Sequence, residues 1–258
     1  MADMDTCCLI GRGRVYIGEY ICPEPGQTND APKRFIGNTE NLQLDISQTT
    51  QTQTDFTVSN GTDCSVTFID EVTLQLDVRC FNPENIALAF YGEGSAMLAQ
   101  PAFSEDLAVP SAVDGAYIAL SQLPDTSATP FVLTDTVGTV LVEGVDYVVR
   151  NSGIELLPGN SVAPGSTLTA TYDTQGCTIT ELITDSQREV TLCFDGFNCV
   201  DNRPFSVTLY RVRLNPVASL GFISDDFQTL TLTGTVNRDE AVQSGTAFSQ
   251  FGIIKQAS

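Results

Sequence analysis

The sequence contains no histidine and no tryptophan, and only 12 of its 258 residues are lysine or arginine. Without histidine, a Ser-His-Asp or Cys-His catalytic pair, a histidine-ligated metal and histidine-based proton transfer are all excluded. Without tryptophan, the chain lacks the usual stacking platform for a sugar ring. The catalytic chemistry that remains is that of paired carboxylates, as in glycosidases.

Three adjacent carboxylate pairs are candidates for such chemistry. They are Asp70 with Glu71, Glu105 with Asp106, and Asp225 with Asp226. Neighbouring residues of a strand point to opposite faces, so these dipeptides are poorly placed to flank one glycosidic bond. Aspartate also favours turns, which is the simpler interpretation of the third pair. We therefore predict that the protein is not an enzyme, and keep a carboxylate glycosidase as one alternative.

Acidic residues outnumber basic ones by 32 to 12, which gives a net charge of −20 at neutral pH. Such a surface repels nucleic acid rather than binding it. The acidic residues are spread along the chain, and 42% of the residues are hydrophobic, which argues against disorder. The length allows one large β domain or a β domain with an inserted module. We expect a folded, soluble, acidic protein.

The cysteines are too widely spaced to indicate a disulfide framework or a metal site. No Cys-x-x-Cys occurs, and no apolar run reaches the roughly eighteen residues of a membrane span or the length of a secretory signal near the start. We predict a cytoplasmic origin, reduced thiols that are mostly buried, no cofactor, no metal and no membrane anchor. The positions are Cys7, Cys8, Cys22, Cys64, Cys80, Cys177, Cys193 and Cys199.

Four segments alternate apolar and polar residues with a period of two, which predicts half-buried strands. They are Asn41–Ser47, Glu71–Cys80, Phe205–Leu214 and Gln228–Val236. Arg211 falls on the opposite register from the polar residues of its own segment. The polar faces consist of Asn41, Gln43, Asp45, Thr73, Gln75, Asp77, Ser206, Thr208, Thr229, Thr231 and Thr233. These faces are uncharged to acidic.

One short helix is expected over Pro83–Tyr91. Asn82 is suited to the N-cap, Pro83 to the first helical position, and Gly92 to the stop. Its apolar residues, Leu88 among them, are expected to pack on a sheet. The predicted fold class is therefore all-β with one short flanking α-helix, built from two packed antiparallel sheets in a sandwich or barrel.

We interpret residues 1–258 as a single domain, in which residues 105–176 form an inserted module or an elaboration of the same barrel. In that zone, short apolar runs are punctuated by glycine and proline at the spacing of a small β sandwich. Pro23–Arg34 and Ser47–Asn60 are predicted to be long polar loops with little to bury locally.

Several blocks, in this order, resemble the major tail tube proteins of long-tailed (siphophage-type) bacteriophages. They are "RFIGNTENLQLDIS", "TDFTVSNGT", "NPENIALAFYG", "TVGTVLVEGVDYVV", "GIELLPG", "STLTATYD" and "YRVRLNPVASLGFISDDFQTLTLTGTVNRDE". The resemblance covers roughly residues 35–240, and the order of the blocks carries it. The zone from Gly138 to Asp173 makes this chain larger than minimal members of that family.

The resemblance implies a structural virion protein, related to the tubes of contractile systems. Its subunits would form stacked rings, usually of six, with sheets that join those of their neighbours into one tube wall. Such a protein is assembled in the host bacterial cytoplasm and resides in the virion tail. Its partners would be further copies of itself, the tape measure, terminator and distal tail proteins, and phage DNA that passes without specific binding.

The resemblance also implies residue roles. The lumen-facing residues would be Asn41, Gln43, Asp45, Thr73, Gln75, Asp77, Thr229, Thr231 and Thr233. The contacts between subunits or rings would involve Pro23, Pro25, Lys33, Arg34, Gln51, Gln53 and Asp55. By pattern alone, a threonine-rich face is more typical of a solvated strand. A monomeric β-sandwich binding, decoration or adhesin module therefore remains an alternative beside the glycosidase.

Overall fold

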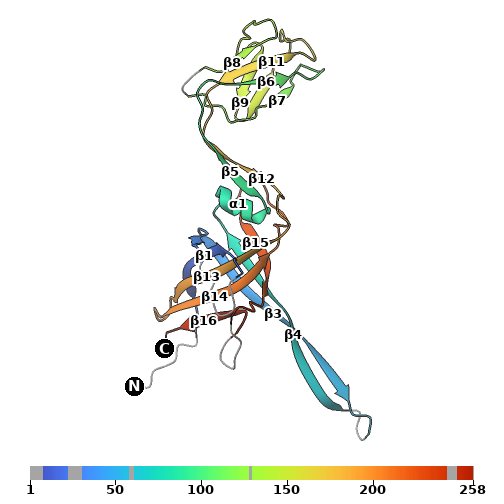
Figure 1. Cartoon of the computed structure of the whole chain (residues 1–258), viewed down its shortest axis with the longest axis vertical. Coiled ribbons are helices and arrows are strands. Elements are labelled where there is room, and N and C mark those ends of the chain that lie inside the picture. The colour runs from blue at the N-terminus through green and yellow to red at the C-terminus, as the bar shows by residue number, and fades with distance from the viewer. Residues whose placement is uncertain (1–7, 23–30, 58–60, 128–129, 243–248, 258) are drawn as a thin grey trace. The chain divides into compact units, whose positions relative to one another are not determined.

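The computed structural model describes residues 8–22, 31–57, 61–127, 130–242 and 249–257. The chain divides into two compact units, residues 1–93 with 180–258, and residues 94–179. Nearly all of the described regular structure is antiparallel strand, with one short helix (Figure 1), so the predicted all-β class with a single helix is confirmed. The second unit has wider bounds than the 105–176 zone expected from composition.

The first unit is built on one eight-stranded sheet with the strand order β2-β1-β13-β14-β15-β4-β3, in which β16 also pairs with β14. Its elements are β1 (Gly11–Glu19), β2 (Lys33–Phe35), β3 (Thr39–Thr54), β4 (Thr62–Val78), α1 (Pro83–Ala89), β13 (Arg188–Asn198), β14 (Pro204–Leu214), β15 (Leu230–Asn237) and β16 (Gly252–Gln256). The four segments with period-two alternation correspond to parts of β3, β4, β14 and β15.

One face of this sheet forms the core of the first unit. Alternate residues such as Leu76 of β4, Leu232 of β15 and Leu192 of β13 are fully buried in one cluster. Each buried leucine contributes about 1.5–3 kcal/mol relative to an exposed one. The residues between them lie on the opposite face, so the alternation separates the core from a polar surface.

Helix α1 packs against this core through Leu88 and Ala89, as expected. Asn82 caps the helix, since its side chain accepts a hydrogen bond from the Asn85 amide at 2.7 Å. The helix ends at Ala89 rather than at Tyr91, whose positive φ of 52° is incompatible with a continued helix.

Asn85 fixes the position of this helix. Its buried amide donates to the carbonyls of Ile36 and Cys80 at 2.8 and 2.9 Å, and its Oδ1 accepts from Arg34 at 2.7 Å. This buried amide joins the helix to the distant segment around Arg34 and Ile36, and to the end of the preceding connection at Cys80. Every hydrogen bond it makes replaces one that water would otherwise supply.

The second unit consists of two facing three-stranded sheets, β7-β10-β9 and β6-β11-β8. Their inner faces enclose a separate hydrophobic core that includes Leu133, Ile154 and Leu168. The strands are β6 (Phe103–Ala108), β7 (Tyr117–Ala119), β8 (Val132–Thr134), β9 (Tyr147–Arg150), β10 (Gly153–Leu156) and β11 (Thr167–Tyr172). Strands β5 (Glu93–Met97) and β12 (Cys177–Glu181) pair with each other and carry the chain into and out of this unit.

Asp146 organises a loop of the second unit. Its carboxylate accepts from the amides of Val142 and Ser161 at 2.9 and 3.0 Å, and from the Ser161 hydroxyl at 2.8 Å. These hydrogen bonds, led by the Val142 amide, hold the pKa of Asp146 below its usual value. The ionised form is therefore the one that the fold favours.

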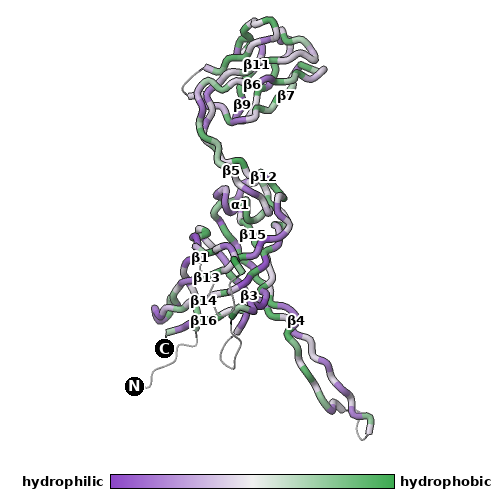
Figure 2. Tube along the Cα trace, in the orientation of Figure 1, coloured by the Kyte–Doolittle hydropathy of each residue, from purple (hydrophilic) through white to green (hydrophobic). Residues whose placement is uncertain are grey.

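Strands β3 and β4 extend beyond the rest of the sheet as a hairpin (Figure 1). We call residues 47–71 the β3–β4 arm. All its described residues are exposed except the half-buried Asp55, and Figure 2 shows polar and apolar residues mixed along it. The prediction of a loop over Ser47–Asn60 is wrong for Ser47–Thr54, which is strand. Of these two strands, β4 also pairs with β15, but only through Thr73–Val78, which lies outside the arm.

None of the seven described cysteines is in a disulfide with another described residue. The prediction that most are buried is wrong, because Cys8, Cys22, Cys64 and Cys199 are exposed and the other three are half-buried. Within the described ranges, no helix combines the length and apolar character needed to cross a bilayer.

Candidate functional site

The structure gathers most of the predicted lumen residues on one surface of the first unit. Three rows of paired residues run across β3, β4 and β15. We call this grid the polar face. Its rows are Asn41–Asp77–Thr231, Gln43–Gln75–Thr233 and Asp45–Thr73–Thr235.

Asp77 is the centre of the hydrogen bonding on the polar face. Its carboxylate accepts from the Thr231 hydroxyl at 2.7 Å and from the amides of Asn41 and Gln75, each at 3.2 Å. These bonds link all three strands through one half-buried side chain. Asp45 is exposed at the other end of the grid and accepts from Gln43 at 2.9 Å.

Thr229 is the one predicted lumen residue that does not join the grid. Strand β15 begins at Leu230, so Thr229 belongs to the irregular segment that precedes it. Thr235 instead supplies the third threonine of β15 in the grid, and its hydroxyl donates a hydrogen bond to Glu71 at 3.0 Å. Sequence reasoning left Thr235 out, although its position in the same alternation was the available signal.

The polar face meets two arginines on its β14 side, contrary to the expected register. In the register of β14 with β15, Arg211 lies opposite Asn237, and Arg213 lies opposite Thr235. A register shift between β13 and β14 at Val190/Leu192 reverses the alternation, which places Arg211 on the polar side. Arg211 forms an ion pair with Glu189 at 2.8 Å, so part of this positive charge is neutralised locally.

The chemistry of the polar face is that of a hydrated, acidic surface. The grid has two carboxylates, Asp45 and Asp77, with Glu71 beside it, and no cation among its nine residues. A phosphate would find no positive partner within the grid, and Arg213 opposite Thr235 is the cation at its β14 border. Among the described residues, no group of three or more Cys, Asp or Glu side chains is arranged to hold a metal ion.

The residues predicted to make contacts between subunits fall in separate places. Gln51, Gln53 and Asp55 lie on the β3–β4 arm, whereas Lys33 and Arg34 lie on β2 at the other end of the strand order. Arg34 is engaged internally by an ion pair with Glu84 at 3.1 Å and by Asn85. Pro23 and Pro25 lie outside the described residues.

The candidate carboxylate pairs have ordinary structural partners. Glu105 accepts from the Tyr172 hydroxyl while Asp106 accepts from Thr169 at 2.8 Å. Hydrogen bonding to Glu105 and, above all, burial raise the pKa of Tyr172. Asp70 accepts from Thr49, and the pair Asp225 and Asp226 lies in the irregular segment before β15.

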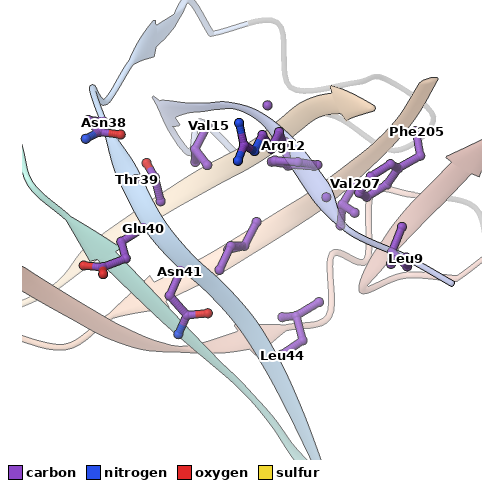
Figure 3. A pocket seen from close by; sticks show the side chains of 14 residues that line it. Leu9, Arg12, Val15, Asn38, Thr39, Glu40, Asn41, Leu44, Phe205 and Val207 are labelled. Carbon is purple, nitrogen blue, oxygen red and sulfur yellow. The ribbon is translucent and has the colours of Figure 1, made fainter. Parts of the chain in front are cut away.

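A groove of about 760 Å³ forms a second candidate site in the first unit (Figure 3). Its lining includes Gly11 and Gly13 of β1, Leu42 and Leu44 of β3, and Phe205 and Val207 of β14. Arg12 and Glu40 also contribute to the lining. The carboxylate of Glu40 is paired with Arg79 at 2.7 Å, so Arg12 is the free charge of this groove within the described ranges.

Residues 8–255 match the sequence profile of the family described as "Protein of unknown function UCP028589". The chain belongs to this family. The matched range begins and ends in the first unit and includes the second. No curated protein matches the sequence.

Proposed function

We propose that this protein is a structural virion subunit, the major tail tube protein of a long-tailed bacteriophage. Its subunits assemble into stacked rings that form the channel for DNA delivery. The rings are usually hexameric in the family that the sequence resembles. On this proposal it has no catalytic activity and no cofactor. It assembles in the bacterial cytoplasm onto tape measure, terminator and distal tail proteins.

The observation that carries this proposal is the open edge of β3. This strand is 16 residues long and lies at one end of the strand order. Its residues from Ile46 to Thr54 include no charge and no proline. Monomeric proteins usually protect such an edge with charges and prolines as well as bulges, because an open edge pairs with other strands. Here the register shifts at Ser47/Gln48 and Gln53/Thr54 are present, whereas charges and prolines are absent. A partner strand from a neighbouring subunit supplies the missing protection.

The β3–β4 arm supports the same proposal. A two-stranded hairpin in water is marginally stable by itself, since it has no layer to pack against. The arm nevertheless exposes Val66, Phe68 and Ile69. Contact with another subunit would bury this apolar area and extend the sheet.

The polar face fits the wall of a channel for DNA. In a ring, each carboxylate of the face is repeated once per subunit, so Asp45 and Asp77 would form circles of negative charge. Such a wall repels phosphates and keeps the DNA hydrated and moving. Arg211 adds little attraction because it is paired with Glu189, whereas Arg213 lies opposite Thr235 at the β14 border of the face.

Electron microscopy of concentrated, purified protein tests this proposal. We expect rings with a central hole, or tubes. In analytical ultracentrifugation, we expect a sedimentation coefficient that increases with protein concentration. Replacing Thr50 and Thr52 by lysine should block assembly by placing charge along the open edge. Thr167→Lys on the exposed end of β11 is the matched control. A wild-type protein that remains monomeric at all concentrations would contradict the proposal.

A specific observation favours the binding-module alternative for part of the chain. Four valines of the second unit are exposed, namely Val137, Val140, Val142 and Val145. Clustered exposed apolar residues often mark a site of protein contact. On this alternative, the purified chain stays monomeric and binds an assembled virion or a cell surface, and Val137→Asp with Val145→Asp removes that binding.

A further inference from the structure

The segment between β14 and β15 exposes large apolar side chains to an unusual extent. Phe222, Ile223 and Phe227 are 84%, 98% and 94% exposed. Asp225 and Asp226 lie between them in the sequence. Scattered exposed apolar residues are normal, but three within six residues form a patch of the kind that marks an interaction site. We call residues 222–227 the apolar-acidic loop.

The groove of the first unit has the complementary character. Gly11 leaves the ring of Phe205 uncovered, since a Cβ at this position would lie 3.1 Å from that ring. Leu42 and Leu44 of β3 also line the groove, and Figure 3 shows Leu44 on this strand. The volume of about 760 Å³ lies within the roughly 300–1,000 Å³ typical of binding pockets. The groove therefore has room for several apolar side chains of a peptide segment.

Arg12 supplies the charge that an acidic segment requires. It is exposed, lines the groove, and forms no ion pair with any residue of the described ranges. In a protein with a net charge of −20, an unpaired arginine beside an apolar groove is a specific feature. It selects an occupant that carries negative charge next to apolar residues.

We propose that the apolar-acidic loop of one subunit docks into the groove of a second copy of the chain. Phe222, Ile223 and Phe227 would cover the apolar walls, while Asp225 and Asp226 would lie against Arg12. The loop does not fill the groove of its own chain, because its apolar side chains are exposed. This inference rests on the proposed self-assembly and names the contact that drives it.

The symmetry of this contact agrees with a ring. Each subunit offers one loop and one groove, so the contact is either exchanged reciprocally in a two-fold dimer or repeated head-to-tail, and the proposed ring requires the head-to-tail arrangement. Head-to-tail contacts close into rings or continue as filaments, whereas a two-fold contact stops at a dimer. In the head-to-tail arrangement, the loop–groove contact supplies a propagating interface in addition to the open edge of β3.

Truncation of the loop is the first part of the test. Phe222→Ser, Ile223→Ser and Phe227→Ser together should raise the critical concentration for assembly at least about 30-fold, as loss of a central apolar anchor does. Folding should be unaffected, because the three side chains are exposed, and circular dichroism checks this. Leu98→Ser, at a side chain of the second unit that is 81% exposed, is the control.

Charge reversal then tests the partner. Arg12→Glu alone, or Asp225→Arg with Asp226→Arg alone, should weaken assembly, and the loss should respond to salt. A mixture of the two variant proteins should assemble, since each loop then meets a groove of opposite charge on the other protein. If the loop docked into its own chain, mixing would not restore assembly.

The outcomes separate this inference from the proposed function. Wild-type protein that forms tubes, together with a loop-truncated variant that assembles equally well, overturns the loop–groove contact and leaves the tube proposal standing. Loss of assembly on truncation without rescue by mixing overturns the groove as the docking site. A monomeric wild-type protein overturns both proposals.

Discussion

The hydroxyl of Thr231 donates a 2.7 Å hydrogen bond to Asp77 across the pairing of β15 with β4. The same carboxylate accepts from Asn41 on β3 at 3.2 Å. One acidic side chain therefore joins three strands. The polar face contributes to the stability of the sheet as well as to its surface charge, and its two aspartates are expected to respond differently to substitution.

Asp77→Lys should destabilise the first unit, whereas Asp45→Lys should not. The first substitution leaves the hydrogen bonds of Thr231 and Asn41 without an acceptor, at a cost of about 1–3 kcal/mol. The second changes an exposed strand position, for which the typical effect is within about 0.5 kcal/mol. Urea unfolding measures both. Equal losses of stability would mean that Asp77 does not connect the strands.

Asp45→Lys should make assembled tubes retain DNA. The substitution changes the charge by two units in every subunit of a ring, and the resulting circle of cations attracts phosphates. Co-sedimentation with a short duplex at low salt should show DNA with the variant tubes only, and added salt should release it. Variant tubes that leave the DNA in the supernatant would place the polar face away from the lumen.

Asn85→Ala should destabilise the protein by several kcal/mol. The change leaves the buried carbonyl of Ile36 and the half-buried carbonyl of Cys80 without these donors, at roughly 1–3 kcal/mol for each group. Asn82→Gly is the control, since glycine at an N-cap costs only a few tenths of a kcal/mol. Thermal and urea unfolding compare the two variants. A loss for Asn85→Ala no greater than that for Asn82→Gly would show that these bonds are dispensable.

Backbone amides of the β3–β4 arm should exchange rapidly in the monomer and slowly after assembly. In the monomer the arm is a two-stranded hairpin with exposed side chains, which opens at little cost. Pairing with a neighbour protects its outer edge. Hydrogen exchange with mass spectrometry measures the change, and β11 of the second unit serves as an internal reference. Equal protection of the arm in both states would exclude it from the assembly contacts.

The second unit should lose stability in acid through Asp146. Its folded-state pKa lies below its usual value, so the ionised carboxylate stabilises the fold above about pH 4, and this contribution disappears as the pH falls through the lowered pKa. Asp146→Asn should reduce the slope of the melting temperature against pH in this range. Glu143→Gln, an exposed neighbour, should keep the wild-type slope. Identical slopes for all three proteins would remove Asp146 from the acid response.

The sequence predicted the strands whose two faces differ, because burial of alternate residues leaves a period-two pattern. The polar face follows from this pattern, since Asp77 lies between the buried Leu76 and Val78, and Thr231 between the buried Leu230 and Leu232. Asp45 continues the same alternation, between Leu44 and Ile46, where the strand is exposed. The helix could also be predicted from the sequence, because Asn82 and Pro83 are local signals of a helix start.

Other features depend on contacts that no local pattern records. Ser47–Thr54 has no apolar face, so its extension as part of β3 depends on its pairing with β4 rather than on alternation. The position of Arg211 results from a register shift against β13, and one extra residue reverses every later prediction of side-chain direction. Asn85 is a polar residue of a short helix, and only the tertiary structure shows that it is buried.

Strands β5 and β12 have a consequence for the variability of this chain. Because they pair with each other, residues 94–179 leave and return at positions one strand spacing apart, about 4.8 Å. From the viewpoint of the eight-stranded sheet, the whole second unit is equivalent to the turn of a hairpin. A module of another size could be grafted at this junction, or a short turn could replace it, without altering the register of any strand in the first unit.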